Sequence, residues 1–233
     1  MNEKIRWARV LLEAFVIVGS ILLAFGIQAW WDNRLDESYV RSALEDTLVE
    51  MTAVGADLDL NAPVYRSTLS RLDSLRALME SASAGVTFAI PDTLLAALFY
   101  DYVADFPSGM VQSVISSGHL DKVRSDVLRR SLLSWIALLE DQRDDQTRAS
   151  AFGSMELQPY LRAEFDVVRA EWADRSAAPV DRHLSTDIAI TPRLRNLVVW
   201  QRRWLDRILR QNDTLLQRRM ELDSLIRAEI RLH

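Results

Sequence analysis

The sequence predicts an all-α fold, in which one N-terminal transmembrane helix is followed by an extracytoplasmic antiparallel bundle of long helices. Three observations predict it. An apolar segment near the N-terminus is long enough to span a bilayer. Apolar residues then recur at three- and four-residue steps along most of the remaining chain. Only 7 glycines and 6 prolines occur in 233 residues, whereas a sheet with many tight turns would need more of both.

The predicted span runs from Val10 to Trp31, and it is uncharged after Glu13. About 20 residues of helix cover roughly 30 Å, which matches the hydrocarbon thickness of a bilayer. Trp7 lies before the span and Trp30 and Trp31 end it, so we expect these three side chains to anchor the helix at the two interfaces. The bilayer is therefore the first predicted partner.

The apolar segment has two alternative interpretations. A buried helix of a soluble protein is disfavoured by the length of the apolar run. A cleaved signal peptide would be cut near Gly26, but the apolar run continues to Trp31. An uncleaved signal anchor remains the prediction.

The charges on either side of the span predict its orientation. Lys4, Arg6 and Arg9 precede it, while residues 32–37 are mixed and acidic. The positive-inside rule then places residues 1–9 in the cytoplasm and residues 32–233 outside it. In a bacterium this is a single-pass protein of the inner membrane with a periplasmic helical domain.

One face of the predicted span carries polar and small residues. Glu13, Ser20, Ala24 and Gln28 have spacings of 7, 4 and 4 residues, which place them on one side of a helix. Such a stripe in a membrane usually faces another helix. For Glu13 alone, a pair with Arg9 one turn earlier is an equal alternative. We predict a packing surface for other membrane protein subunits.

The remaining chain is predicted to form helices in the following order. A long helix from Val40 to Met79 can continue directly from the span, with Pro63 expected to kink or split it, and residues 81–85 end it. A short helix begins with Pro91 as its first residue and stops at Pro107, and another reaches Ser117 and is capped by a left-handed Gly118. A long helix follows from Leu120, and its polar tail, residues 140–148, is interpreted as a solvated face. An irregular lobe covers residues 166–190, and the last helix starts at Thr191-Pro192, with the threonine as N-cap.

The predicted span resembles the corresponding segment of a large bacterial family of single-span proteins of unknown function. In that family the span reads roughly G-E-I-x-L-V-V-I-G-I-L-I-A-L-x-I-N-N-W-N-E. Glu13, Ala24 and Trp30 match it, Ser20 stands at a family Gly and Gln28 at a family Asn.

The middle of the chain, residues 114–135, resembles the same family's S-S-G-x-L-x-x-I-x-x-x-x-L-R-x-x-L, here with Asp after the Leu. The C-terminal helix is similar in pattern, so the resemblance covers most of the chain apart from residues 166–190. It implies one membrane helix plus an extracytoplasmic helical domain, and it implies no activity.

No catalytic or metal-binding motif stands out. The chain has no cysteine, which excludes disulfides, thiolate metal sites and cysteine nucleophiles. Its three histidines are far apart, and His119 is interpreted as a structural residue bridging two helices. Asp101 and Asp105, one turn apart, could hold a cation, but the six or more oxygen ligands of such a site are not visible. We therefore predict no enzyme activity, no metal and no cofactor, and the net charge of −5 argues against a nucleic-acid partner.

A second candidate partner surface lies on the last helix. Trp200 and Trp204 are one turn apart, with Arg203 and Arg207 beside them, and tryptophan and arginine are enriched at protein interfaces. The alternative is that one tryptophan is core and the arginines are solvated.

These observations favour a non-enzymatic accessory or scaffold subunit that docks on a larger membrane protein complex and stabilises it. An energy-converting complex, such as a photosynthetic reaction-centre/light-harvesting or respiratory complex, is one candidate. The alternative is a membrane-tethered periplasmic sensory or ligand-binding bundle, which would have to signal through a partner because about nine residues precede the span. A homo-oligomer also stays open.

Overall fold

The computed structural model describes every residue except 1, 82–86, 101–105, 166–184 and 233. Nearly all described residues lie in helices, and α1, at 80 residues, is by far the longest. The elements in chain order are α1 (Asn2–Ser81), β1 (Thr87–Pro91), α2 (Asp92–Leu95), η1 (Ala96–Phe99), α3 (Gly109–Ser116), η2 (His119–Lys122), α4 (Asp126–Phe152), η3 (Gly153–Leu157), α5 (Gln158–Glu164), β2 (Ser185–Ala189) and α7 (Pro192–Ile230). The predicted all-α character is confirmed, with one small sheet added.

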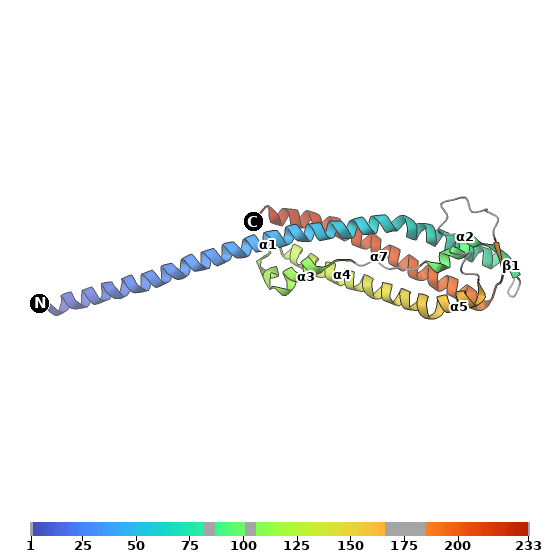
Figure 1. The fold of residues 1–233 in the computed structure, drawn as a ribbon. Helices are drawn as coiled ribbons and strands as arrows, with labels where there is room; N and C mark the ends of the chain where they lie inside the picture. The colour runs from blue at the N-terminus through green and yellow to red at the C-terminus, as the bar shows by residue number, and fades with distance from the viewer. Residues whose placement is uncertain (1, 82–86, 101–105, 166–184, 233) are drawn as a thin grey trace.

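Helix α1 runs without a break from the apolar segment into the packed domain (Figure 1). The predicted continuity is therefore confirmed, and the predicted split at Pro63 is wrong. Pro63 lies inside the helix with its side chain exposed, and its missing N–H removes one backbone hydrogen bond there. Burial of Ala62 and Tyr65 on the inner side offsets that loss, because packing stabilises the turns around the proline.

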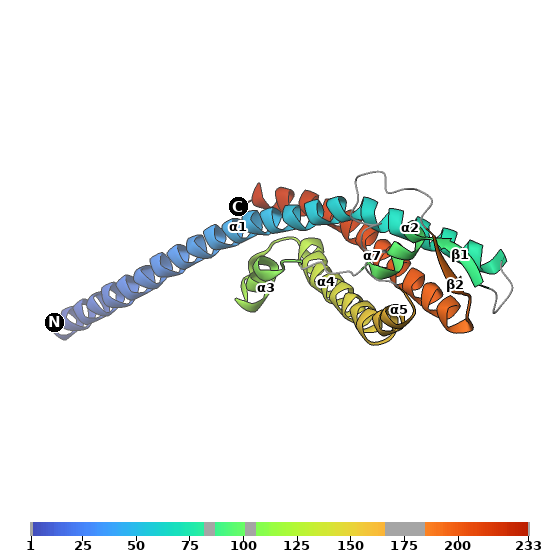
Figure 2. The ribbon, with the colours of Figure 1, turned by 45° about the vertical axis from the view of Figure 1, so that its right-hand side comes forward.

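The packed domain consists of three long helices lying lengthwise. Helix α7 lies beside α1 and also contacts α4, and it runs in the opposite direction to both (Figures 1 and 2). The C-terminal end of α7 lies near the middle of α1, where packing begins, and the short helix α3 lies at the same end. The sheet lies at the far end of the domain.

Two hydrophobic clusters follow each other along the domain. The cluster nearer the apolar segment consists of Val40, Leu44, Met51, Val54, Leu58, Phe106, Val111, Val123, Leu128, Leu132, Trp135, Leu139, Leu215, Leu222 and Ile226. The farther cluster is built around Tyr65, Leu72, Leu75, Met79, Leu161, Leu194, Leu205 and Ile208, with residues of the sheet and of α2 and η1. Burial of these side chains, about 1.5–3 kcal/mol each, is the main favourable term in packing the three helices.

A buried polar layer separates the two clusters. Gln142, Asp145 and Gln146 of α4 and Asn212 of α7 are all less than a tenth exposed. They lie between Leu139 and Ala149 on one helix and between Leu209 and Leu215 on the other, which belong to different clusters. The expected solvated tail over residues 140–148 is therefore wrong for this side of the helix, because α7 covers it.

The two strands were not expected. β1 pairs with β2 antiparallel, with Phe88 opposite Ile188, so the end of the predicted irregular lobe, residues 185–189, is ordered as a strand. The rest of that lobe, residues 166–184, lies outside the described residues. Thr186 donates a hydrogen bond to the Asp92 carboxylate at 2.6 Å, which ties the sheet to the start of α2.

Three further predictions need correction. Pro91 ends β1 and is the N-cap of α2, so it precedes the helix by one residue. That short helix ends at Phe99, and Tyr100 is extended. The long middle helix starts at Asp126 and not at Leu120, because η2 and an extended Val123 come between.

The predicted helix signals at three positions are confirmed. Gly118 has φ 75°, the left-handed conformation that glycine adopts without steric cost, and it follows the end of α3. Thr191 is the N-cap of α7, and its hydroxyl accepts a hydrogen bond from the Leu194 amide at 3.1 Å. Helix α1 ends at Ser81, where the small-residue segment begins.

Candidate functional site

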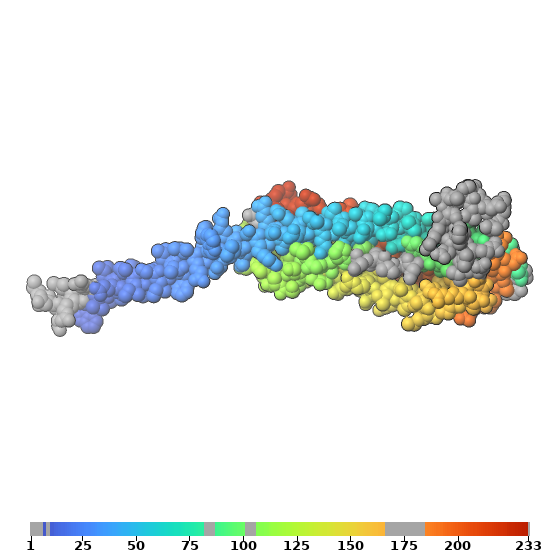
Figure 3. Space-filling view, in the orientation of Figure 1, coloured from blue at the N-terminus to red at the C-terminus, as the bar shows by residue number. Residues whose placement is uncertain are grey.

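The first half of α1 is the most distinctive surface of the molecule. It is the one helix of the described chain that is long and apolar enough to cross a membrane, with a mean hydropathy of 2.5 over its most apolar window and none of that window buried. Every side chain from Val10 to Leu35 is exposed, and this part of the helix extends away from the packed domain (Figure 3). No described residue covers it, so it is a large exposed apolar surface.

The predicted packing stripe lies on this bare segment. Glu13, Ser20, Ala24 and Gln28 are all exposed and all on one continuous helix. The Ser20 hydroxyl donates to the Val16 carbonyl at 2.7 Å, so its hydrogen bond is satisfied within the helix. Ser20 and Ala24 then offer a partner helix a small surface for close approach, without a polar group left to satisfy.

The three predicted interfacial tryptophans flank the segment. Trp7, Trp30 and Trp31 are all more than half exposed. The Arg34 guanidinium lies 5.7 Å from the ring centre of Trp30, a cation–π arrangement that keeps the charge next to the amphipathic ring. Trp7 and Trp31 are separated by roughly 35 Å along the helix axis at 1.5 Å per residue, the spacing expected of anchors at the two interfaces.

Where the bare segment meets the packed domain, α1 is held by a small polar cluster. Lys122 approaches Asp36 at 2.9 Å, and His119 approaches the same carboxylate at 3.7 Å. The Lys122 hydrogen bond lowers the pKa of Asp36. The His119 ring stacks on Tyr39 at 4.2 Å between centres, so His119 connects η2 to α1 in the bridging position predicted for it.

The end of α7 closes the same region. Buried Glu229 accepts hydrogen bonds from the backbone amides of Arg124 and Ser125, the residues just before α4. Arg124 in turn pairs with Glu37 of α1 at 3.1 Å. These contacts join α1, α4 and α7 directly beyond the apolar segment.

The second predicted surface is also assembled by the fold. The Arg203 guanidinium lies 5.4 Å from the Trp200 ring centre, Trp200 is 49% exposed, and Trp204 is partly buried against the farther cluster. Two shallow hollows of about 460 and 370 Å³ share these tryptophans. We name Trp200, Arg203 and Trp204 the tryptophan surface.

Arg207, predicted as part of this surface, has a different role. It donates to the Asp145 carboxylate at 2.5 Å, and Gln211 donates to the same oxygen at 2.6 Å. Asp145 is 2% exposed, and a buried carboxylate needs such partners. Arg207 therefore supports the polar layer, although half of its side chain remains exposed. Trp204 packs partly on the core, as the alternative expects of one tryptophan, and Trp200 is exposed; its role as a partner surface stays a prediction.

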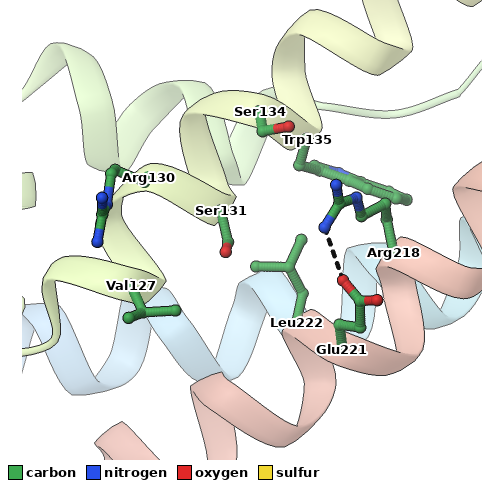
Figure 4. Close-up of a pocket in the computed structure, with 8 residues that line it drawn as sticks. All are labelled: Val127, Arg130, Ser131, Ser134, Trp135, Arg218, Glu221 and Leu222. Atoms are coloured by element: carbon green, nitrogen blue, oxygen red, sulfur yellow. Dashed lines mark hydrogen bonds and ion pairs between the residues drawn. The ribbon is translucent and has the colours of Figure 1, made fainter.

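Sequence reasoning missed a pocket between α4 and α7. Its volume is about 250 Å³, and Figure 4 shows Ser131 and Leu222 near its centre with Arg130 and Arg218 on opposite sides. Arg218 pairs with Glu221 at 2.8 Å. The buried Trp135 indole N–H has no hydrogen-bond partner among the described residues. No motif marks this site, because its residues come together only through packing of the two helices.

The described residues contain no cluster of His, Asp or Glu with the geometry of a metal site. Asp101 and Asp105, the predicted carboxylate pair, lie outside the described residues. Comparison with known proteins finds no matching family model, no matching curated protein and no matching solved structure.

Proposed function

We propose that this protein is a non-enzymatic, single-span accessory or scaffold subunit that docks on a larger membrane protein complex and stabilises it. One observation carries the proposal: α1 joins the apolar segment to the packed domain without a linker. Val40 is already fully buried, nine residues or about 14 Å of helix after Trp31. A domain held so stiffly suits a scaffold, because its distance and direction from the membrane are fixed.

In the proposed arrangement the protein lies in a bacterial inner membrane, with its N-terminus in the cytoplasm and its helical domain, an antiparallel bundle, in the periplasm. The basic residues before the span support this orientation. Its partners are the lipid bilayer and other membrane protein subunits, which it contacts through the stripe on the span and through the periplasmic domain. An energy-converting complex, photosynthetic or respiratory, is one candidate. The resemblance to the bacterial single-span family supports the architecture and assigns no reaction.

The test is purification of the tagged full chain in mild detergent, with mass spectrometry of the proteins that accompany it. We expect a stoichiometric set of membrane proteins with the wild type, and loss of that set with Ser20→Leu/Ala24→Leu, because leucine prevents close helix approach.

Gly19→Leu/Gly26→Leu is the matched control. It makes the same kind of change on the other side of the same helix, where a new side chain meets nothing within 4 Å. It should keep the set. Loss of the set in the control as well, or retention in both variants, would contradict the stripe as the docking surface.

Ligand binding is the second candidate function, and the pocket beside Trp135 is the observation that favours it. Its lining offers the Arg130 guanidinium and two serine hydroxyls, while Arg218 is paired with Glu221 of the same lining; the donors of Arg130 and the serines suit an anionic group. Ser20→Leu/Ala24→Leu would not affect a ligand site there. If the wild type and this variant both purify without other proteins, ligand binding becomes the favoured function.

A further inference from the structure

The outward side of α1, beyond the apolar segment, carries a row of exposed apolar and small residues. Val49 is 71% exposed, Leu60 74% and Val64 44%. Ala53 and Ala56 lie between them and are exposed too. We name these five residues the outer face. The inner side of the same turns is buried in the cluster nearer the apolar segment, so the outer face is an apolar side of α1 that the described residues leave uncovered.

The outer face has the spacing of a helix-packing surface. Its steps are 4, 3, 4 and 4 residues, which place all five side chains on one side of the helix. Its three larger residues lie toward the ends, Val49 at one and Leu60 and Val64 at the other, and the two alanines between them allow a second helix to approach closely.

The outer face is also in line with the stripe on the span. Ala24 and Leu60 are 36 residues apart, which is about ten turns at 3.6 residues per turn. Because α1 is continuous, both groups lie on the same side of one rod. The outer face begins roughly 27 Å beyond Trp31 and ends roughly 50 Å beyond it, at 1.5 Å per residue. A neighbour in the membrane that meets the stripe and continues outward would meet the outer face as well.

Charge identifies the chemistry of the partner. Residues 42–65 contain five acidic residues and no lysine or arginine. Two of the five are occupied: Glu45 pairs with Arg41 at 3.1 Å, and Glu50 accepts a hydrogen bond from the Met110 amide at 2.9 Å. Asp46, Asp57 and Asp59 are exposed beside the outer face. A basic helix would complement them.

A second copy of this chain fits poorly. Two copies anchored in one bilayer are parallel and at the same height, so the acidic residues of one would face those of the other. Like charges opposed in this way disfavour pairing, and no basic residue in 42–65 could compensate.

We propose that the outer face docks an amphipathic helix of a partner protein, one with an apolar stripe flanked by lysine or arginine. This inference rests on the proposed function, because it assigns the partner surface and the chemistry of the subunit that meets it.

The direct test uses the full chain in nanodiscs of phosphatidylcholine, which carry no net charge. The probe is a fluorescein-labelled helical peptide of about 20 residues, with leucines at 4-3 spacing and lysines beside them. We expect saturable binding by fluorescence anisotropy that weakens as salt is raised. Val49→Gln/Leu60→Gln should reduce affinity about tenfold or more, which is 1.4 kcal/mol, because it removes apolar contact without adding a charge that attracts the lysines of the probe. Asp46→Lys/Asp57→Lys should also reduce it.

Leu133→Gln/Met220→Gln is the matched control, since it places the same uncharged amides at two exposed apolar positions on α4 and α7. It should bind the probe like the wild type. Equal binding of a glutamate version of the peptide, or unchanged binding by Val49→Gln/Leu60→Gln, would overturn the proposal. Circular dichroism of each variant checks that a loss of binding does not come from a loss of folding.

A second measurement addresses the occupant in native membranes. Because the chain has no cysteine, Leu60→Cys is a clean single-site probe. A disulfide-linked dimer of the chain on oxidation would overturn the proposal, since it would make a second copy the occupant. Crosslinking from position 60 to a lysine- or arginine-rich helix would support it.

The two proposals fail separately. If Ser20→Leu/Ala24→Leu loses the accompanying subunits while Val49→Gln/Leu60→Gln keeps them and the probe does not bind, the docking role stands and the outer face does not. If the chain purifies alone in every form, the proposed function itself is wrong.

Discussion

The two halves of α1 belong to one continuous helix but differ in which of their sides are exposed. From Val10 to Leu35 every side chain is exposed, and apolar residues surround the helix. From Val40 onward only one side is buried, and charged residues occupy much of the other. A helix that is apolar all round is stable only where its whole circumference is covered. The packed half, by contrast, is covered on one side only, chiefly by α7 and also by α2, η1, α3 and η2.

One continuous helix joins the apolar segment to the packed domain without a hinge. The change of environment falls between Trp31 and Val40, where Asp36 and Glu37 bind residues of the packed domain. Backbone hydrogen bonding continues through this junction, so the stiffness of the helix is carried across it.

The largest expected difference between the halves is in packing energy. Leu44→Ala removes a fully buried side chain and should destabilise the domain by about 2–5 kcal/mol. Leu22→Ala, at an exposed position of the same helix, should change domain stability by less than about 0.5 kcal/mol. Thermal unfolding in detergent, followed by circular dichroism, measures both. Similar losses for the two variants would show that the halves are not energetically distinct.

A smaller difference is expected for polar residues. The Gln142 amide donates to the Asn212 carbonyl oxygen at 2.7 Å, and both side chains are buried. Asn212→Leu should cost about 1–3 kcal/mol, because it leaves a buried donor unsatisfied, whereas Gln142→Leu/Asn212→Leu should be closer to neutral. Gln28→Leu, in the bare half, is the control and should leave domain unfolding unchanged. Additive losses in the double variant would contradict a coupled pair.

The smallest effect concerns the junction and depends on pH. Lys122 lowers the pKa of Asp36 through a hydrogen bond, so the pair stabilises the folded state above the usual aspartate pKa of about 3.9. This contribution is lost as pH falls through the lower value of the folded state. Between about pH 6 and pH 3 the melting temperature of the wild type should therefore fall more than that of Asp36→Asn. Asp32→Asn, at an exposed position, should behave like the wild type, and identical pH profiles for all three would contradict a role for the pair.

Features that depend on a few neighbouring residues could be predicted from the sequence. The capping residues Thr191 and Gly118, the end of α1 at Ser81 and the buried stripe of α7 follow from local chemistry and a period of 3.6 residues. The junction between span and domain could also be predicted, because no helix-breaking residue occurs there.

Other features needed contacts between distant segments. Nothing in residues 140–148 shows that Gln142 and Asp145 are buried, since that depends on the register of α4 against α7. The pairing of β1 with β2 joins segments almost a hundred residues apart, and the helix continues through Pro63 because its neighbours Ala62 and Tyr65 are packed. The role of Arg207 likewise became visible only when Asp145 was placed beside it.

The sequence by itself determined that this chain has one segment suited to a bilayer and long amphipathic helices after it, because hydrophobic periodicity and length are local properties. Only the tertiary structure decided which sides of those helices are covered. It buried the polar layer of α4, whose sequence is typical of a solvated helix face, and it left the outer face of α1 exposed. Exposure is a property of neighbours far away in the chain, and for that reason the candidate docking face at Val49 and Leu60 could be recognised only in the folded molecule.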